Sequence, residues 1–379
     1  MTKIKTIKKE KIDEESNKNV FETKRFLLLI LAILLIIGTI IFLNDKKAES
    51  TNETIIQEIT VNNTHSLKKD ELFPKAKELV SPNGYINVKN ITIAEQIGKK
   101  VVLVDFWTYS CINCQRTTPY LNSWNEKYKD AGLMIIGVHT PEFAFEKEYA
   151  NVLYATQKFG ITYPVIQDNE YKTWRAYKNQ YWPRKYLIDI DGYIAYDHVG
   201  EGGYVDTEEE IQKLLQERKE ILNLNISIPT GIVNPSVTPM QFGDIGTNEI
   251  YFGYAFSRDQ LGNKEGLQPE KIVSYKIPQE TEKNMFYLEG DWKNNGDNME
   301  LVSTEGTIKL TYYAKKLYMV ASSNSEKPVN IYTTVDEKFE INTTIQHSEL
   351  YTLANNTPAF HTAIIKAKKG LKTYTFTFG

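Results

Sequence analysis

The pattern of apolar and polar residues between positions 99 and 222 predicts alternating strands and helices. Continuous apolar runs, such as VVLVDFW at residues 101–107, are typical of parallel strands that are covered on both faces. Between these runs, apolar residues recur at helical spacing, as Leu121, Trp124 and Tyr128 do. The predicted order is strand, helix, strand, helix, strand, hairpin and helix, at residues 99–107, 115–132, 133–138, 145–160, 163–168, 184–200 and 207–222. This order indicates an α/β layer architecture.

Two local signals refine this pattern. Asp191 and Gly192 stand between two strand-like runs and predict the turn of the hairpin. Thr207 is followed three residues later by Glu210, which predicts a capping box at the start of the last helix.

The C-terminal part of the chain has a different pattern. Residues 225–240 are rich in Asn, Pro, Ser and Thr, which predicts a linker. Beyond them, apolar and polar residues alternate between Gly, Asn and Ser turns, as in the segments 306–322, 327–337, 360–370 and 371–379. Residues 241–379 are therefore predicted to form an antiparallel β-sandwich.

The N-terminal part contains one uncharged apolar run, residues 26–43, after a basic and polar tail at 1–25. A helix over this run is about 27 Å long, enough to cross the hydrocarbon core of a membrane. Lys24 and Arg25 lie directly before it, so the positive-inside rule keeps residues 1–25 in the cytoplasm and places the rest outside. A retained single-pass anchor in the cell membrane is the prediction, and a cleaved signal peptide is the alternative. Residues 44–78 are read as a polar tether.

Composition narrows the class of function. The length of 379 residues allows two or three domains. The formal net charge of -3 leaves no basic excess to neutralise phosphates, which argues against nucleic-acid binding.

The chain has two cysteines, Cys111 and Cys114, and they lie at the junction between a predicted buried strand and the following helix. Unpaired N–H groups and the helix dipole at that end favour negative charge on the first sulfur, which is the form that attacks disulfides. The second sulfur lies one turn along the helix, where it can release a mixed disulfide. The spacing therefore predicts a redox-active cysteine pair.

Three other interpretations of the pair stay open at this point. A zinc site would need further ligands such as His139 or His198, whose spacing does not indicate one. A structural disulfide would close a very small loop and constrain the unfolded chain little. A peroxidase of the peroxiredoxin type would match Thr108, but it would need proline where Val104 stands.

Several stretches resemble the extracytoplasmic thioredoxin-like domains of the TlpA type, and most of all the thioredoxin-like part of DipZ proteins. They are VDFWTYSCINCQRTTPYL, IGVHTPEFAFEK, YPVIQDNEYKTWRAYKNQYWPRKYLIDIDG and HVGEGGY, in family order. The resemblance implies a thioredoxin fold over residues 79–224. It also implies thiol–disulfide exchange in which Cys111 attacks and Cys114 resolves. The redox-active disulfide Cys111–Cys114 would then be the only redox group, with no other cofactor and no metal.

The resemblance also implies roles for other residues. Pro183 occupies the cis-proline position, where the backbone of Trp182 can pair with a substrate segment. Asp105 matches the buried aspartate that helps to deprotonate the resolving cysteine, and burial should raise its pKa. A core acid without a catalytic role is the alternative for Asp105.

Four further residues are candidates for substrate binding because they flank the cysteines or belong to the stretches that resemble DipZ. They are Trp107, Tyr109, His139 and Glu142. Trp107 and Tyr109 are expected to shape an apolar rim, and His139 and Glu142 to line the site. For all four, a purely structural role in packing or loop geometry is the alternative.

Two departures from the family pattern limit the prediction. Ile112-Asn113 replaces the Gly-Pro pair of thioredoxin, so the sequence leaves open whether the chain reduces, oxidises or isomerises disulfides. Thr117 stands where the cytochrome-maturation branch carries Glu, which weakens a cytochrome-specific interpretation.

The C-terminal domain resembles the jelly-roll domain of DipZ proteins, which is similar to carbohydrate-binding modules. The fold class predicted for the whole chain is a membrane helix, an α/β thioredoxin fold and an all-β jelly-roll sandwich. The expected partners are exported cysteine-containing proteins, a separate membrane electron donor or acceptor, and a glycan or protein ligand of the sandwich. The alternative is a non-enzymatic surface protein that binds through the sandwich.

Overall fold

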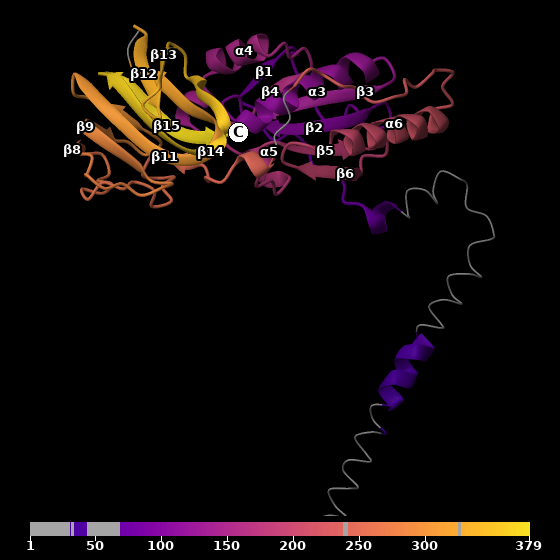
Figure 1. The fold of residues 1–379 in the computed structure, drawn as a ribbon. Coiled ribbons are helices and arrows are strands. Elements are labelled where there is room, and N and C mark those ends of the chain that lie inside the picture. Colours follow the sequence, from indigo (N-terminus) through magenta and orange to yellow (C-terminus); the bar gives the residue numbers. More distant parts are fainter. Residues whose placement is uncertain (1–30, 32–33, 44–68, 238–241, 325–326) are drawn as a thin grey trace, which may run out of the picture. The chain divides into compact units, whose positions relative to one another are not determined.

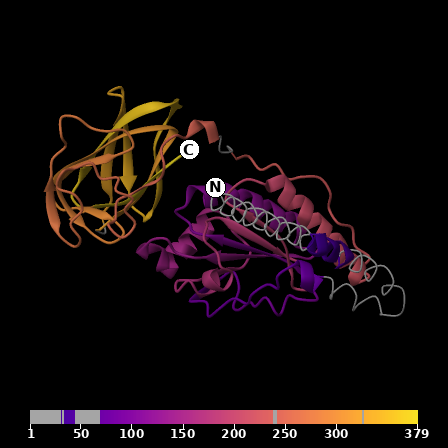
Figure 2. The same ribbon diagram turned by 90° about the horizontal axis from the view of Figure 1, so that it is seen from below.

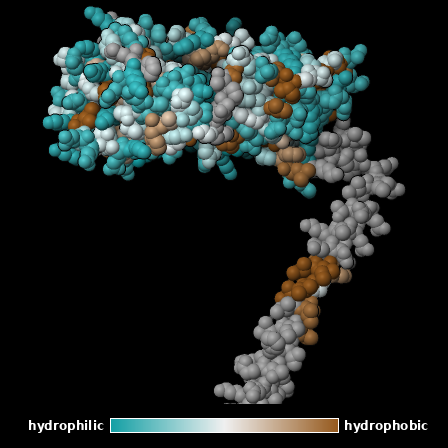
Figure 3. Space-filling model, in the orientation of Figure 1, coloured by the Kyte–Doolittle hydropathy of each residue, from teal (hydrophilic) through white to brown (hydrophobic). Residues whose placement is uncertain are grey.

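The computed structural model describes residues 31, 34–43, 69–237, 242–324 and 327–379. The described residues fall into two units, one within residues 1–68 and the other within residues 69–379. In the first unit, residues 34–43 are helical and their large apolar side chains are exposed, which Figure 3 shows in brown. Among the described residues, no helix is both long and apolar enough to cross a membrane.

Parts of the N-terminal prediction lie outside the described residues. They are the basic tail 1–25, positions 26–30, 32 and 33 of the predicted membrane helix, and positions 44–68 of the predicted tether. The rest of the predicted tether, residues 69–78, is folded, so the tether prediction is wrong there. Lys69 donates to Asp189, Asp191 and Glu217 at 2.6–2.7 Å. These carboxylates lie about 120–150 positions after Lys69 in the chain. The composition of residues 69–78 therefore does not indicate that they are bound there.

A six-stranded sheet forms the centre of the N-terminal half of the second unit, in the order β1-β4-β3-β2-β5-β6 (Figure 1). The strands are β1 Gly84–Ile86, β2 Val101–Trp107, β3 Leu133–His139, β4 Val165–Gln167, β5 Arg184–Ile188 and β6 Ile194–Val199. Strand β2 runs parallel to β3 and antiparallel to β5. All seven residues of β2 are buried, as its continuous apolar run predicts.

Helices cover this sheet because β2 is apolar on both faces. They are α3 Ile112–Tyr128, η1 Ala144–Lys147, α4 Tyr149–Lys158, α5 Lys172–Ala176 and α6 Tyr204–Ile221. Leu103 of β2 belongs to a core cluster with Trp124 of α3 and Leu215 of α6. Val104, its neighbour along β2, belongs to a separate cluster with Tyr177 and Tyr186. The predicted α/β thioredoxin-like layering is therefore confirmed.

Helix α6 begins earlier than the sequence predicts. Its first residue is Tyr204 and its N-cap is Gly203, which has the left-handed backbone conformation at φ 57°. Thr207 lies inside the helix, where its hydroxyl donates to the Gly203 carbonyl at 2.7 Å. The capping-box prediction for Thr207 and Glu210 is therefore wrong, because the hydroxyl bonds back to the preceding turn instead. The described part of the predicted linker, residues 225–237, has neither helix nor strand, and the backbone N–H of Val233 donates to Glu208 of α6.

The C-terminal half is all-β, as predicted. After η2 Phe242–Asp244 its strands are β7 Ile250–Tyr251, β8 Ile272–Tyr275, β9 Phe286–Asn294, β10 Met299–Leu301, β11 Glu305–Ser323, β12 Val329–Val335, β13 Phe339–Ile345, β14 Glu349–Lys368 and β15 Leu371–Phe378. The pairings among these strands are antiparallel. Strand β11 pairs with β9 near its start and with β15 near its end, so the strands curve around one core (Figure 2).

Candidate active site

The structure places both cysteines where β2 leads into α3. Cys111 is the N-cap of α3, with extended backbone angles, and its Sγ accepts the backbone N–H of Cys114 at 3.4 Å. Cys111 is partly exposed, whereas Cys114 is buried. A sulfur that accepts an N–H at a helix N-terminus is placed where negative charge is favoured. The geometry therefore matches the predicted division into an accessible attacking sulfur and a sheltered resolving sulfur.

Cys114 needs a base before it can act. Burial, the hydrogen bond with Cys111, and the negative charges of Cys111 and Asp105 raise the pKa of the Cys114 thiol well above its usual value. Asp105 is itself buried, and burial raises the pKa of its carboxyl to about 7, while the charge of Lys185 opposes the rise. The predicted rise in the pKa of Asp105 is confirmed. A carboxyl that titrates near neutrality suits general-base catalysis.

Lys185 is a functional candidate that the sequence prediction missed. It lies on β5 directly opposite Asp105 on β2, and its side chain is only 1% exposed. Its ammonium donates to the Gly200 carbonyl at 3.2 Å. Burial lowers the pKa of Lys185, and the negative charges of Asp105 and Cys114 raise it in part. The sequence signal was a lysine inside a predicted strand, two residues after Pro183.

The cis-proline prediction is confirmed, because the Trp182–Pro183 peptide bond is cis. Trp182 is partly buried and its indole N–H donates to the Thr140 carbonyl at 3.1 Å. Trp182 and Cys111 pack against the same core cluster. The cysteine pair lies at the start of α3, directly after β2. The buried acid lies on β2, and the cis-proline directly precedes β5, which pairs with β2.

Two family models match the chain. One is described as Redoxin and matches residues 68–215; the other is described as a thioredoxin-like C-terminal domain and matches residues 247–379. The protein DipZ of Mycobacterium bovis is 35% identical over 314 residues, which cover 80% of this chain and 43% of DipZ. The chain belongs to the thioredoxin-like family of the DipZ and TlpA type.

Other relatives cover different shares of this DipZ-type chain, which spans less than half the length of DipZ itself. The thiol-disulfide oxidoreductase YkuV of Bacillus subtilis is 27% identical over 140 residues, which are 37% of this chain and 93% of YkuV. A solved thioredoxin-like protein in its oxidized form is 26% identical, with a TM-score of 0.36 over 39% of this chain and 98% of that one. Residues 68–215 therefore match the Redoxin model, and this part of the chain is similar to a protein named as a thiol-disulfide oxidoreductase.

Three of the residues predicted to bind substrate lie in the interior of this DipZ-type domain. Trp107 is 2%, Tyr109 3% and His139 0% exposed, so they form no exposed rim in this structure. The His139 ring stacks on Tyr109 at 5.6 Å and meets Trp107 edge-on at 5.1 Å. Burial lowers the pKa of His139 to about 3, so its ring is neutral at physiological pH. Their positions agree with the packing alternative.

Glu142 lies where the thioredoxin-like domain meets the C-terminal all-β domain. The Tyr251 hydroxyl is 2.7 Å from Oε1 of Glu142 and 2.7 Å from Oε2 of Glu249. A hydroxyl has a single hydrogen, so it can donate to only one of the two carboxyls, and the other must carry a proton of its own. Burial and the charges of Glu249 and Glu146 raise the pKa of Glu142 to about 8.

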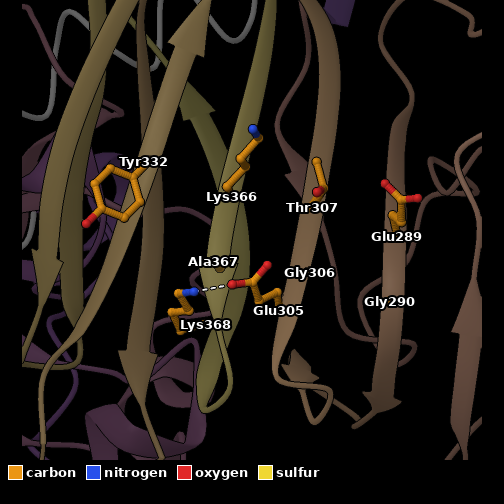
Figure 4. A pocket seen from close by; sticks show the side chains of 9 residues that line it. All are labelled: Glu289, Gly290, Glu305, Gly306, Thr307, Tyr332, Lys366, Ala367 and Lys368. Carbon is orange, nitrogen blue, oxygen red and sulfur yellow. Dashed lines mark hydrogen bonds and ion pairs between the residues drawn. The ribbon is translucent and has the colours of Figure 1, made fainter.

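A hollow on the outer face of the C-terminal sheet has a volume of about 390 Å³ (Figure 4). Four neighbouring strands contribute one side chain each in register: Tyr332, Lys366, Thr307 and Glu289. Next to this row, the ammonium of Lys368 pairs with the carboxylate of Glu305. An aromatic ring, two carboxylates and two ammonium groups therefore line one hollow.

We expect Lys185 to set the pH at which Asp105 acts. Replacing Lys185 with Met removes the charge that holds the pKa of Asp105 down, so the resolving step should start at a pH about one unit higher. Asp105→Asn should slow that step about a hundredfold. The measurement is the rate at which Cys114 releases thionitrobenzoate from a preformed mixed disulfide on Cys111. An unchanged pH profile in Lys185→Met would contradict the pairing.

We expect the free energy of unfolding to decrease as pH rises, because of the raised pKa of Glu142. Its pKa is raised in the folded chain, so the folded state holds a proton that the unfolded state has released. The associated stability is complete below the ordinary carboxyl pKa and is lost as pH rises toward 8. Urea unfolding at several pH values should show a shallower fall in the free energy of unfolding for Glu142→Gln. Equal slopes would show that the carboxyl titrates normally.

Proposed function

We propose that the chain is a membrane-anchored thiol–disulfide oxidoreductase that exchanges disulfides with exported proteins outside the cytoplasm. The observation that carries this proposal is the arrangement of the cysteine pair. A partly exposed Cys111 sulfur accepts an N–H at a helix start, and a buried Cys114 follows within one turn. This is the arrangement that two-step thiol–disulfide exchange requires.

The exchange balances without a cofactor. The Cys111 thiolate attacks one sulfur of a substrate disulfide; that S–S bond breaks, one substrate thiolate leaves, and a mixed disulfide forms. Asp105 then takes the proton of Cys114, and the Cys114 sulfur attacks the Cys111 sulfur. The second substrate thiolate leaves, and two electrons have passed from the dithiol to the substrate. The same steps in reverse oxidise a substrate dithiol.

The membrane part of the proposal is supported by the apolar run at residues 26–43. Its described part, 34–43, is helical and exposes apolar side chains that water disfavours. We infer that a membrane partner supplies the electrons for substrate reduction. In the oxidising direction, the same partner accepts them.

The decisive experiment uses the cysteine variants of the full chain. Cys111→Ser should abolish reduction of insulin disulfides by dithiothreitol-charged protein, because the attacking sulfur is gone. Cys114→Ser keeps that sulfur and should accumulate mixed disulfides, which can be isolated from cells and identified by mass spectrometry.

A matched control is Ser123→Ala, which removes a hydroxyl farther along the same helix that donates to the Pro119 carbonyl. Both cysteines stay intact in this variant, so it should reduce insulin like the wild type. Full insulin reduction by Cys111→Ser would show that the pair is not the reacting group. Exported proteins on the trapped Cys114→Ser chain would support the assigned substrates, whereas cytoplasmic proteins alone would contradict them.

A second candidate function is ligand binding by the β-sandwich, which the hollow beside Tyr332 favours. An exposed ring next to charged groups suits a glycan, since the ring can cover a sugar face while the polar groups bond its hydroxyls. Glycan-array binding by the full chain should fall at least about tenfold in Tyr332→Ala. Binding that persists unchanged in this variant would place the ligand elsewhere.

A further inference from the structure

Glu146 is a buried carboxylate whose hydrogen bonds reach the residue before the attacking cysteine. Its Oε1 accepts the backbone N–H of Ser110 at 3.2 Å and the Ser110 hydroxyl at 2.6 Å. Its Oε2 accepts the backbone N–H groups of Glu142 at 2.6 Å and Phe143 at 3.0 Å. Glu146 is 0% exposed. One side chain therefore ties the turn before Cys111 to the loop that follows β3.

This tie acts on the turn that sets the direction of the Cys111 sulfur. Ser110 is 1% exposed and directly precedes the N-cap residue of α3. Hydrogen bonds to a carboxylate are among the stronger ones in proteins, and two of them fix both the peptide and the side chain of Ser110. Cys111 itself is partly exposed and cannot be fixed by packing alone. Ser110, which precedes Cys111, is therefore a place where hydrogen bonds can control the position of Cys111.

The loop that carries Glu146 is in turn held by the β-sandwich. Phe143 is 1% exposed and its ring lies 5.2 Å from the ring of Tyr374 on β15. The Phe145 ring meets the same tyrosine edge-on at 4.7 Å. The backbone N–H of Ala144 donates to Asp297 at 3.1 Å. Three consecutive residues of the loop thus contact the C-terminal domain.

We propose that Glu146 is a positioning residue for Cys111, and that the β-sandwich, by holding residues 143–145, is part of the scaffold that positions this nucleophile. The inference rests on the proposed thiol–disulfide exchange and assigns the C-terminal domain a role in it. Loosening the loop lets Ser110 move, and the Cys111 sulfur then leaves the Cys114 N–H. Attack by Cys111 becomes slower although both cysteines are present.

The first test changes the hydrogen bonds that Glu146 accepts. Glu146→Gln keeps the shape but points an amide N–H₂ group at backbone and hydroxyl donors. In the reduced full chain, alkylation of Cys111 by iodoacetamide should slow about tenfold, measured by mass spectrometry at one pH. A matched variant, Ile331→Ala, lowers the stability of the sandwich from within its core, far along the chain from this loop. It should leave the alkylation rate unchanged.

The second test changes a residue of the C-terminal domain. It tests the positioning role even if Glu146→Gln fails to fold. Tyr374→Ala removes the ring that holds Phe143 and Phe145, so Cys111 alkylation should slow severalfold. Tyr374→Phe keeps the ring and loses the hydroxyl, whose contact is with Ser322 at 3.1 Å, so it should restore the wild-type rate. Equal rates in Tyr374→Ala and wild type would overturn the proposal. So would an equal fall in Tyr374→Ala and Ile331→Ala, because that fall would reflect stability alone.

Insulin reduction by the wild-type chain separates failure of the proposed function from failure of the positioning role. If the wild type reduces insulin and the Tyr374 pair shows no difference in alkylation, the positioning role is wrong and the proposed function stands. If the wild type fails to reduce insulin while Tyr374→Ala still slows alkylation, the proposed function is wrong and the positioning of Cys111 stands.

Discussion

The burial of β2 is the constraint on which the site depends. Seven consecutive buried residues place Asp105 in the interior, where a carboxylate needs either a proton or a neighbouring cation. The adjacent strand supplies Lys185, which is just as deeply buried. The balance between burial and this cation leaves the pKa of Asp105 at about 7. The carboxyl that we propose as the base for Cys114 thus owes its raised pKa to burial in the sheet and to its strand neighbour.

The attacking cysteine faces the opposite demand, because it must be accessible to a large substrate. Packing encloses Cys114 fully but Cys111 only in part, so the hydrogen bonds around Cys111 also contribute to its position. The helix start supplies one, from the Cys114 N–H, and the bonds between Glu146 and Ser110 fix the residue before it. Because the loop of Glu146 also packs on Tyr374, the two domains meet at a point that matters for the chemistry.

The sequence was sufficient to place the parts of this site that lie close together along the chain. The cysteine pair lies at the predicted strand-to-helix junction, and the family resemblance led to the buried Asp105 and to the cis bond before Pro183. The missed partners come from pairing between distant segments, since Lys185 meets Asp105 through strand register and Glu146 reaches the turn before the cysteines across 36 positions. The tether prediction failed at Lys69 for the same reason, because the three carboxylates around its ammonium lie on distant segments. Long-range charge pairing, unlike hydrophobic periodicity, leaves no trace in a local pattern.

The buried charges near Cys114 also explain how a proton could pass from Cys114 to Asp105 with a small free-energy cost. Lys185 supplies one positive charge, and its field acts on both Asp105 and Cys114. When Asp105 takes the proton of Cys114, one negative charge moves from the carboxylate to the sulfur, and the total charge facing Lys185 stays the same. A transfer that keeps the buried charge constant avoids the desolvation cost of creating a new ion. The lysine therefore stabilises the pocket both before and after the resolving sulfur becomes reactive.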